Sequence, residues 1–351
     1  MCVAFKPTAA GAEFIALALF HAHPRVAVAF NANMDPAMVA MRKALQSLYK
    51  TNSAYNNDYT DIGGHDDRPV PACDVFVSGV PCSAWECAGH KLSDGSHPIF
   101  SSLRYVRRAL PRLVIFDNLD AAMPASVLEV IRHILVMSGY RVDMSILDTK
   151  HHGIPHSRHR LCIVAVRLDA EVEQFTFPDR MSDAPALEHF LRQSPHRTFM
   201  RFVPGGLAKR CTYIGRPSIN GCNFSTKWFV LDPLAHQQSK RMLLRGMVPF
   251  HCRNSFVDIC PTVYEIGALQ GLPANAVAAM LRSLDNDCAT LGHVIGDATS
   301  VNVLMRILPR ALFSTGLVAK PLPDHWALAL TMSTGRGSAL KLPEALYAAV
   351  A

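Results

Sequence analysis

VFVSGVPCSAW, at residues 75–85, begins with five residues of strand character that end in Ser-Gly-Val-Pro. Cys82 follows directly. A strand that ends at Gly and Pro and is followed at once by a thiol is typical of the carboxyl edge of an open α/β sheet, where such folds place their chemistry. Most cysteines of intracellular proteins are inert small apolar residues. Whether Cys82 is a nucleophile therefore depends on the segments around it.

Strand and helix character alternate through the first 180 residues. Short apolar, β-branched runs predict strands at 26–30, 73–80, 113–118, 141–147 and 160–166. Helical periodicity predicts helices at 35–48, 100–110 and 124–138. Because strands alternate with helices, we expect an α/β fold: a doubly wound, mostly parallel sheet covered by helices on both faces.

The charge of the chain is concentrated in one segment. The 351 residues carry a net charge of +7, whereas residues 181–255 hold 11 Lys and Arg and 3 Asp and Glu, a net charge of +8. This segment is rich in Gly, Pro, Asn and Ser, and aromatic residues lie among the basic ones. It predicts a small, loop-rich β domain that binds a polyanion such as nucleic acid; a solvated basic surface is the alternative.

Helical patterns return at 262–312, and a moderately apolar tail follows at 318–351. We therefore expect a main domain at 1–180, an inserted domain at 181–256, and a return to the main domain, with a tail, at 257–351. Half of the residues are hydrophobic and 18% are charged, which favours a large buried core over disorder.

Membrane insertion, secretion and metal binding find little support in the sequence. No apolar run reaches the roughly 18 residues of a bilayer span, and the N-terminal stretch does not resemble a signal peptide. The ten cysteines lack framework or Cys-x2-Cys spacing, which indicates free thiols in a reducing compartment, the nucleus or the cytoplasm. Arginines near the histidine cluster would repel a cation, so we expect no metal at His151, His152, His156 and His159.

Cys82 belongs to an ordered set of segments. Asp61-Ile62 lies before it, Asp117-Asn118 ends the next predicted strand, and HHGIPHSRHRLCIVAV at 151–166 carries Arg158 and Arg160. In this order the sequence resembles the DNA cytosine-5 methyltransferase family. PCSAWECAG (81–89) and GIPHSRHR (153–160) are similar to its Pro-Cys-Gln-x-Phe-Ser-x-x-Gly and Gly-Val-Pro-Gln-x-Arg-x-Arg motifs, and PTVYEIGALQGLP (261–273) and IGDATSVNVLMRI (295–307) resemble two later ones.

The resemblance covers about residues 1–312 and implies a Rossmann-like methyltransferase sheet at 1–180, with a target-recognition domain inserted at 181–256. It implies a monomer that transfers a methyl group from S-adenosylmethionine (AdoMet) to carbon 5 of cytosine in DNA, after the base has been flipped out of the duplex. Cys82 would attack carbon 6 and so activate carbon 5; an inert core thiol is the alternative.

Three further residues are candidates for the catalytic machinery. Asp117 would protonate the ring at N3 if burial keeps its carboxyl group neutral, and a strand-end cap is the other interpretation. Arg158 and Arg160, at i and i+2 of a strand, point to the same side, where they would hold a carbonyl oxygen or a phosphate. Ion pairs with a neighbouring loop are the alternative for both.

The resemblance also implies an AdoMet site at the carboxyl ends of the first strands. Asp61-Ile62 matches the adenine-binding pair of the family, whereas the methionine loop, FKPTAAG at 5–11, keeps a single glycine, and Asn33 stands where the family has a ribose-binding carboxylate. Gly11 is equally well explained as a turn glycine and Asn33 as a helix cap. The implied cofactor-binding residues are Phe5, Gly11, Asn33, Met34, Asp61, Ile62, Pro81 and Asp297.

Three functions remain open at this point. The first is a DNA cytosine-5 methyltransferase. The second is the same chemistry on transfer RNA, because one branch of the family methylates tRNA and the predicted target domain is small. The third is a catalytically weak or inactive nucleic-acid-binding protein on the same fold, which the altered glycine loop and Asn33 motivate.

Overall fold

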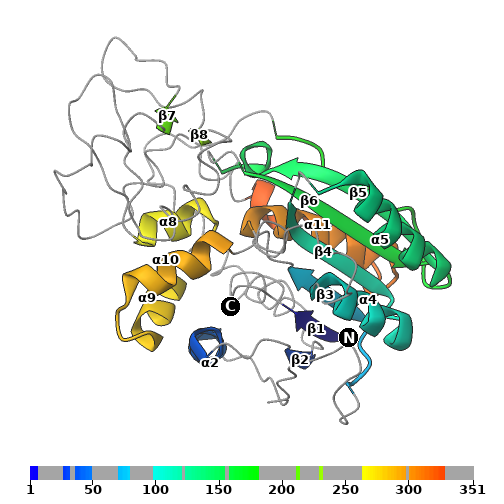
Figure 1. The fold of residues 1–351 in the computed structure, drawn as a ribbon, viewed down its shortest axis with the longest axis horizontal. Helices are drawn as coiled ribbons and strands as arrows, with labels where there is room; N and C mark the ends of the chain where they lie inside the picture. Colours follow the sequence, from blue (N-terminus) through cyan, green and yellow to red (C-terminus); the bar gives the residue numbers. More distant parts are fainter. Residues whose placement is uncertain are drawn as a thin grey trace.

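A computed structural model of the chain describes residues 1–6, 27–31, 36–49, 70–79, 98–120, 123–154, 158–181, 211–213, 229–231, 263–297 and 300–328. A six-stranded sheet forms its centre (Figure 1). The strands are β1 (Cys2–Lys6), β2 (Ala27–Asn31), β3 (Val75–Gly79), β4 (Leu113–Asp120), β5 (Tyr140–Asp148) and β6 (His159–Arg167). They lie side by side in the order β2-β1-β3-β4-β6-β5.

The sheet is mostly parallel, as predicted. β1 pairs in parallel with β2 and β3, and β3 with β4, whereas β6 runs antiparallel to both of its neighbours, β4 and β5. Each strand and helix predicted between residues 26 and 166 is found with its ends within two residues of the prediction. β1, which pairs with two strands, is the one element of this sheet that the periodicity did not indicate.

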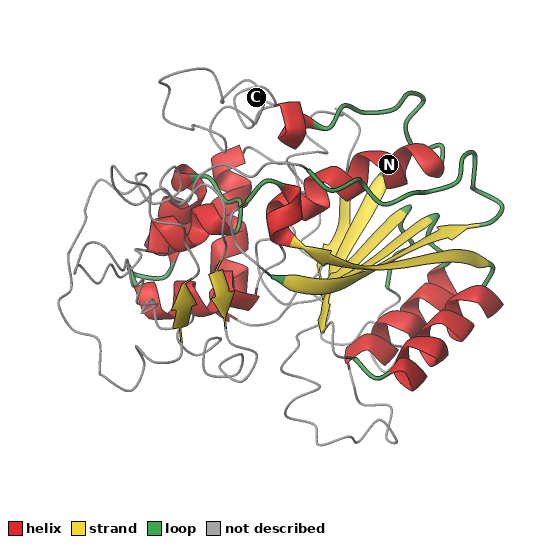
Figure 2. Ribbon diagram, turned by 90° about the horizontal axis from the view of Figure 1, so that it is seen from above, coloured by secondary structure: helices red, strands yellow, loops and turns green. Residues whose placement is uncertain are grey.

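Helices cover both faces of the sheet (Figure 2). They are α2 (Pro36–Tyr49), α4 (Pro98–Ala109), α5 (Ala125–Met137), α8 (Val263–Leu269), α9 (Ala274–Ser283), α10 (Cys288–Asp297) and α11 (Val301–Ser314). Because side chains alternate along a strand, Val77 and Ile115 face one core, formed with α2 and α8–α11, while Phe76 and Phe116 face the other, formed with α4 and α5. The predicted α/β fold with two covered faces is therefore confirmed.

The two later sequence motifs meet in space. Gln270, after α8, and Ser300, before α11, are both buried. The Val301 N–H donates to the Gln270 carbonyl oxygen at 3.1 Å, and the Ser300 hydroxyl donates to Gln270 Oε1 at 3.3 Å. This contact therefore joins the end of α8 to the start of α11.

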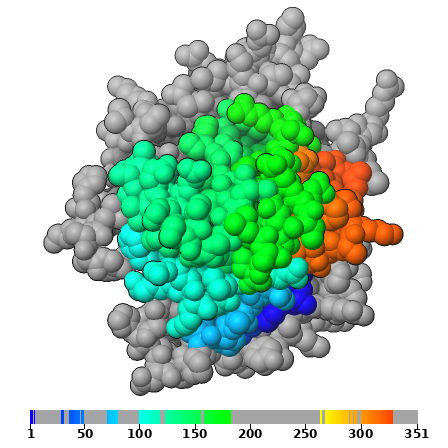
Figure 3. Space-filling model, turned by 90° about the vertical axis from the view of Figure 1, so that its right-hand side faces the viewer, coloured from blue at the N-terminus to red at the C-terminus, as the bar shows by residue number. Residues whose placement is uncertain are grey.

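The loop that follows β6 is hydrogen bonded to the end of α11. The Val172 N–H donates to the Ser314 carbonyl oxygen at 2.8 Å, and the Met181 N–H donates to the His151 carbonyl oxygen at 2.9 Å. In the space-filling view, residues after 300 lie directly against the surface formed by residues up to 181 (Figure 3). Segments about 140 residues apart in the sequence therefore share one surface.

The predicted inserted domain lies largely outside the described residues. Two short strands are described there, β7 (Cys211–Tyr213) and β8 (Phe229–Leu231), and they pair antiparallel. The boundaries at 181 and 256 remain a prediction. In the described part of the chain, no helix is both long and apolar enough to span a membrane.

Two glycines with positive φ give a matched test of packing. Gly271 has φ +82° and Gly139 has φ +87°. A Cβ at Gly271 would lie 2.8 Å from Val301 Cβ and 3.3 Å from the Asn302 nitrogen, whereas a Cβ at Gly139 would meet nothing within 4 Å.

Replacing either glycine with alanine is expected to cost about 1–2 kcal/mol of backbone strain. Gly271→Ala is expected to cost a further 1–3 kcal/mol, roughly, because Val301 must shift. Urea unfolding of the two variants checks this, and equal losses of unfolding free energy would show that the contact between α8 and α11 is not tightly packed.

Candidate active site

The carboxyl ends of β3 and β4 bring the predicted catalytic segments to one edge of the sheet. Gly79, the last residue of β3, is the register partner of Asp117 on β4. Because β6 is antiparallel to β4, its first residues lie at the same edge, with Arg160 opposite Asp120. Cys82 follows Gly79 by three residues and lies outside the described residues.

Asp117 is buried at this edge, with 4% of its surface exposed. Alternation along β4 places it on the same face as Ile115, towards the core that contains α11. Burial raises the pKa of the Cys162 thiol well above its usual value, and Asp117, when ionised, adds to this shift. Cys162 is therefore a neutral core thiol, and Asp117 lies close to it.

Arg158 and Arg160 differ in their surroundings. Arg158 is 7% exposed and precedes β6, so strand alternation does not fix the direction of its side chain. Arg160 lies within β6, is half-buried, and donates through Nη1 to the His159 carbonyl oxygen at 2.8 Å. The structure thus brings both arginines to the edge of the sheet where β3 and β4 end, but gives them different environments.

Asp148, at the end of β5, is a central residue of this edge that the sequence patterns did not single out. It is buried, and its Oδ1 accepts from the Arg158 N–H at 2.9 Å. Its Oδ2 lies 3.1 Å from both Lys150 Nζ and His159 Nε2. Burial acts to raise the pKa of Asp148, but His159, the Arg158 N–H and Lys150 outweigh it, so the net shift is downward.

The short helix η2 (Thr149–His152) follows Asp148, whose side chain accepts from the Lys150 N–H as an N-cap. An Asp directly before a turn, where its side chain can accept from the backbone N–H two residues later, is the signal that would have identified it. Gly153, with φ +89°, ends the helix. Asp148 therefore fixes both the start of η2 and the backbone of Arg158.

His152 is 1% exposed, and its Nδ1 lies 2.8 Å from Arg306 Nη1. A guanidinium group can only donate, so the imidazole accepts and must be neutral. Burial lowers the pKa of His152 to about 4, and the positive charges of Arg306 and His151 contribute. The ring is thus a fixed structural acceptor at neutral pH.

This neutral imidazole predicts a loss of stability in mild acid. Between its folded pKa of about 4 and the ordinary value of 6.5, the unfolded chain binds more protons, so stability is complete above pH 6.5 and falls as the pH falls. The loss between pH 8 and pH 5 is expected to be about 2 kcal/mol. Urea unfolding of the wild type and of His152→Gln checks this, and an equal pH dependence of the two would contradict it.

The histidines near this edge have separate partners. His152 accepts from Arg306, and His159 contacts Asp148. Among the residues that the structure describes, no group of three or more His, Cys, Asp or Glu side chains could hold a metal ion. His156 lies outside those residues.

The frame of the predicted AdoMet site is present. Phe5 on β1 is in register with Asn31 on β2 and with Val77 on β3, so three parallel strands end together. This edge is where open α/β sheets bind nucleotides. Asp297 is the last residue of α10, while Gly11, Asn33, Met34, Asp61, Ile62 and Pro81 lie outside the described residues.

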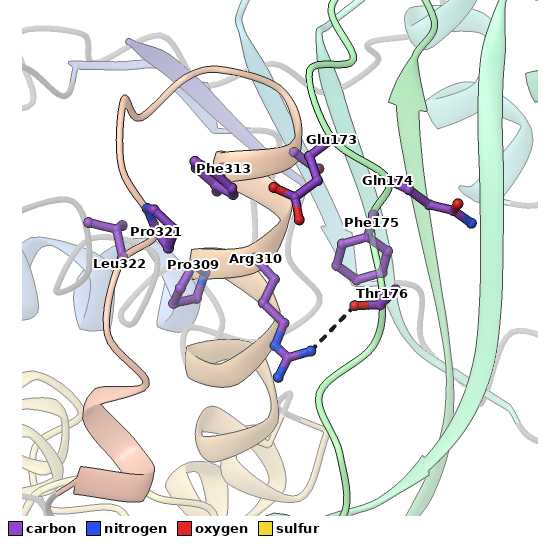
Figure 4. Close-up of a pocket in the computed structure, with 10 residues that line it drawn as sticks. Glu173, Gln174, Phe175, Thr176, Pro309, Arg310, Phe313, Pro321 and Leu322 are labelled. Atoms are coloured by element: carbon purple, nitrogen blue, oxygen red, sulfur yellow. Dashed lines mark hydrogen bonds between the residues drawn. The ribbon is translucent and has the colours of Figure 1, made fainter.

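A cavity of about 330 Å³ lies elsewhere, between the second half of α11 and the loop after β6 (Figure 4). Phe175, Pro309 and Phe313 give it apolar walls, and Arg310 donates through Nη1 to Thr176 Oγ1 at 3.4 Å. None of the predicted catalytic or cofactor-binding residues lines this cavity.

Solved structures of known proteins share this fold. The Dnmt2 methyltransferase of S. pombe has a TM-score of 0.59 and 13% identity, over 89% of this chain and 98% of that one. The Entamoeba histolytica methyltransferase EhMeth has a TM-score of 0.58 and 14% identity, over 89% and 97% of the two chains. The protein therefore has the Rossmann-like fold of the methyltransferases.

Residues 9–201 match the model of the C-5 cytosine-specific DNA methylases, and this chain belongs to that family. The type II methyltransferase M.HhaI of Haemophilus parahaemolyticus is 25% identical over 142 residues, 39% of this chain and 43% of that protein. M.BsuRI of Bacillus subtilis is 30% identical over 133 residues, 36% of this chain and 30% of that protein. The matched stretches span less than half the length of these relatives. The methyl donor of the family is AdoMet.

Proposed function

We propose that this chain transfers a methyl group from AdoMet to carbon 5 of cytosine in DNA, through a covalent bond between Cys82 and carbon 6 of the ring. The observation that carries the proposal is the register of Asp117 with Gly79, because it joins a buried carboxyl group to the strand that leads into Cys82. The family match over residues 9–201 supports the chemistry.

In the proposed reaction the Cys82 thiolate adds to carbon 6, and Asp117, as the carboxylic acid, donates a proton to N3. The burial of Asp117 favours this neutral form, because a buried carboxyl group loses the hydration that stabilises its charge. Carbon 5 then has enamine character and takes the methyl group. A base removes the proton from carbon 5, the bond to Cys82 breaks and the thiolate leaves, and the proton on N3 returns to the Asp117 carboxylate.

The arginines at the edge are proposed to hold the flipped base or its phosphate. Guanidinium groups bind carbonyl and phosphate oxygens through several parallel donors. Arg158 is the better placed to fix a buried group, since it is 7% exposed and its backbone is held by Asp148. Arg160 is half-buried at the start of β6 and is proposed to contact the more exposed part of the nucleotide.

AdoMet, when bound, supplies an electrophilic methyl group. Its proposed site is the aligned ends of β1, β2 and β3. Phe5 and Gly11 would hold the methionine part, Asn33 and Met34 the ribose, and Asp61-Ile62 the adenine, with Pro81 and Asp297 completing the site.

Adduct trapping tests the proposal. A DNA duplex library that carries 5-fluorocytosine in varied sequence contexts is incubated with the protein and methyl-labelled AdoMet. Because a fluorine on carbon 5 cannot be removed as a proton is, the adduct should accumulate and survive denaturation as a labelled protein–DNA band. Folded protein that forms no adduct with any DNA or RNA would count against the proposal.

RNA is the second candidate substrate. The proposed target-recognition domain, residues 181–256, is small, which leaves less surface for reading a duplex. Competition between duplex DNA and transfer RNA in the same assay separates the two substrates. If neither reacts, titration of the protein with AdoMet in a calorimeter distinguishes a binding protein without a donor site from an enzyme without its target.

A further inference from the structure

The backbone of Arg158 is hydrogen bonded to the first residue of helix η2 and to the side chain of Asp148, which precedes it. The Thr149 N–H donates to the Arg158 carbonyl oxygen at 3.2 Å, and the Arg158 N–H donates to Asp148 Oδ1 at 2.9 Å. The first residue of η2 and Arg158 are therefore joined across a nine-residue separation, and any displacement of η2 displaces Arg158.

α11 holds η2 through its first turn. Asn302 is fully buried, and its Nδ2 donates to the His152 carbonyl oxygen at 2.7 Å and to the Thr149 carbonyl oxygen at 3.3 Å. The hydroxyl groups of Thr149 and Ser300 hydrogen bond to each other at 2.7 Å. Because the carbonyl groups of so short a helix lack partners within it, these donors determine where η2 lies.

Arg306 lies one turn later on α11 and is 6% exposed. It donates through Nη1 to His152 Nδ1 at 2.8 Å and through Nε to Asp324 Oδ2 at 2.7 Å. Asp324 uses its other oxygen to accept from the Ala327 N–H at 2.9 Å, so it also caps the turn at 325–328. A charged pair thus links the segment after α11 to η2.

We propose that Arg306 and Asp324 are positioning residues, which hold His152 and η2 and thereby fix Arg158 at the catalytic edge. This rests on the proposed role of Arg158 in binding the target nucleotide. We call Asn302, Arg306, His152 and Asp324 the α11 brace. A buried ion pair is weak evidence for stability, since apolar residues of similar size often replace it without loss. The pair nevertheless holds His152 through Arg306 and the Ala327 N–H through Asp324, and this geometry favours a positioning role.

The test compares Arg306→Met and Asp324→Asn with Arg310→Met. Arg310 lies one turn further along α11, is 41% exposed in its side chain and contacts Thr176 and Phe177 instead of η2. In single turnover on 5-fluorocytosine DNA, Arg306→Met is expected to form the adduct about 10–100-fold more slowly, since small displacements of a binding group cost that much. AdoMet affinity should stay within about twofold in all variants, because β1 and β2 lie at the opposite end of the sheet from β5 and β6.

Hydrogen exchange at the Thr149 and Arg158 amides gives a second readout that needs no activity. We expect faster exchange there in Arg306→Met and Asp324→Asn, with Arg310→Met unchanged. Asp324→Asn keeps an oxygen for the Ala327 cap, so it remains informative if Arg306→Met does not fold. Wild-type exchange or a wild-type rate in a folded brace variant would overturn the proposal. If the wild type itself forms no adduct, the proposed function fails, and the exchange data alone decide whether the brace positions Arg158.

Discussion

Cys82→Ala is expected to abolish both adduct formation and methyl transfer, with a loss of about 10³-fold or more in the rate constant, the order found when an attacking nucleophile is removed. In the proposed reaction carbon 5 of cytosine becomes nucleophilic only while a thiolate is bonded to carbon 6. The measurement is single-turnover transfer of labelled methyl groups, together with the labelled band on a denaturing gel.

Cys288→Ala is the matched control. Of the cysteines described in the structure, Cys73 and Cys162 are buried, and burial raises the pKa of Cys73 to about 12 and that of Cys162 well above its usual value. Cys2 is half-buried, whereas Cys288 is exposed to solvent at the start of α10. An adduct that persists in Cys82→Ala and disappears in Cys288→Ala would reassign the nucleophile.

The strands and helices of the first 180 residues were predictable because each buries an apolar face whose period is visible in the sequence. β3, for example, is buried along all five residues and begins with the apolar run Val75–Val77. β1 has the same length but ends in a lysine, so its apolar pattern is shorter. Its place between β2 and β3 is set by pairing, which local periodicity does not show.

The catalytic candidates were predictable as a set but not as a geometry. The order and spacing of the motifs grouped Asp117, Arg158 and Arg160 as one set, and the structure places their segments at one edge of the sheet. Asp148 and the α11 brace were missed because their contacts join residues far apart in sequence, such as His152 and Arg306, which are separated by 154 positions. Arg306 lies within the motif at 295–307, which does not indicate its contacts, and Asp324 lies outside it. Only the packing of α11 against η2 reveals their role.

Asp117→Asn is expected to lower the rate constant for adduct formation by about 10²–10⁴-fold, the range for removal of a general acid. Asparagine has nearly the same shape and keeps an oxygen that accepts hydrogen bonds, so a strand-end cap would survive the change, whereas the carboxylic acid proton would be lost. Single-turnover adduct formation on 5-fluorocytosine DNA measures the effect, with AdoMet affinity and urea unfolding as checks on folding.

Asp143→Asn, on the half-buried surface of β5, is the control and should react at the wild-type rate. A folded Asp117→Asn variant that also reacts at that rate would mean that Asp117 only caps β4 and that another group protonates N3. A slower and an unchanged rate thus distinguish an acid from a cap. Asp117 is buried in register with Gly79, at the end of the strand that leads to Cys82. In the proposed reaction the Asp117 acid acts on the same ring as the Cys82 thiol, whereas a cap would not.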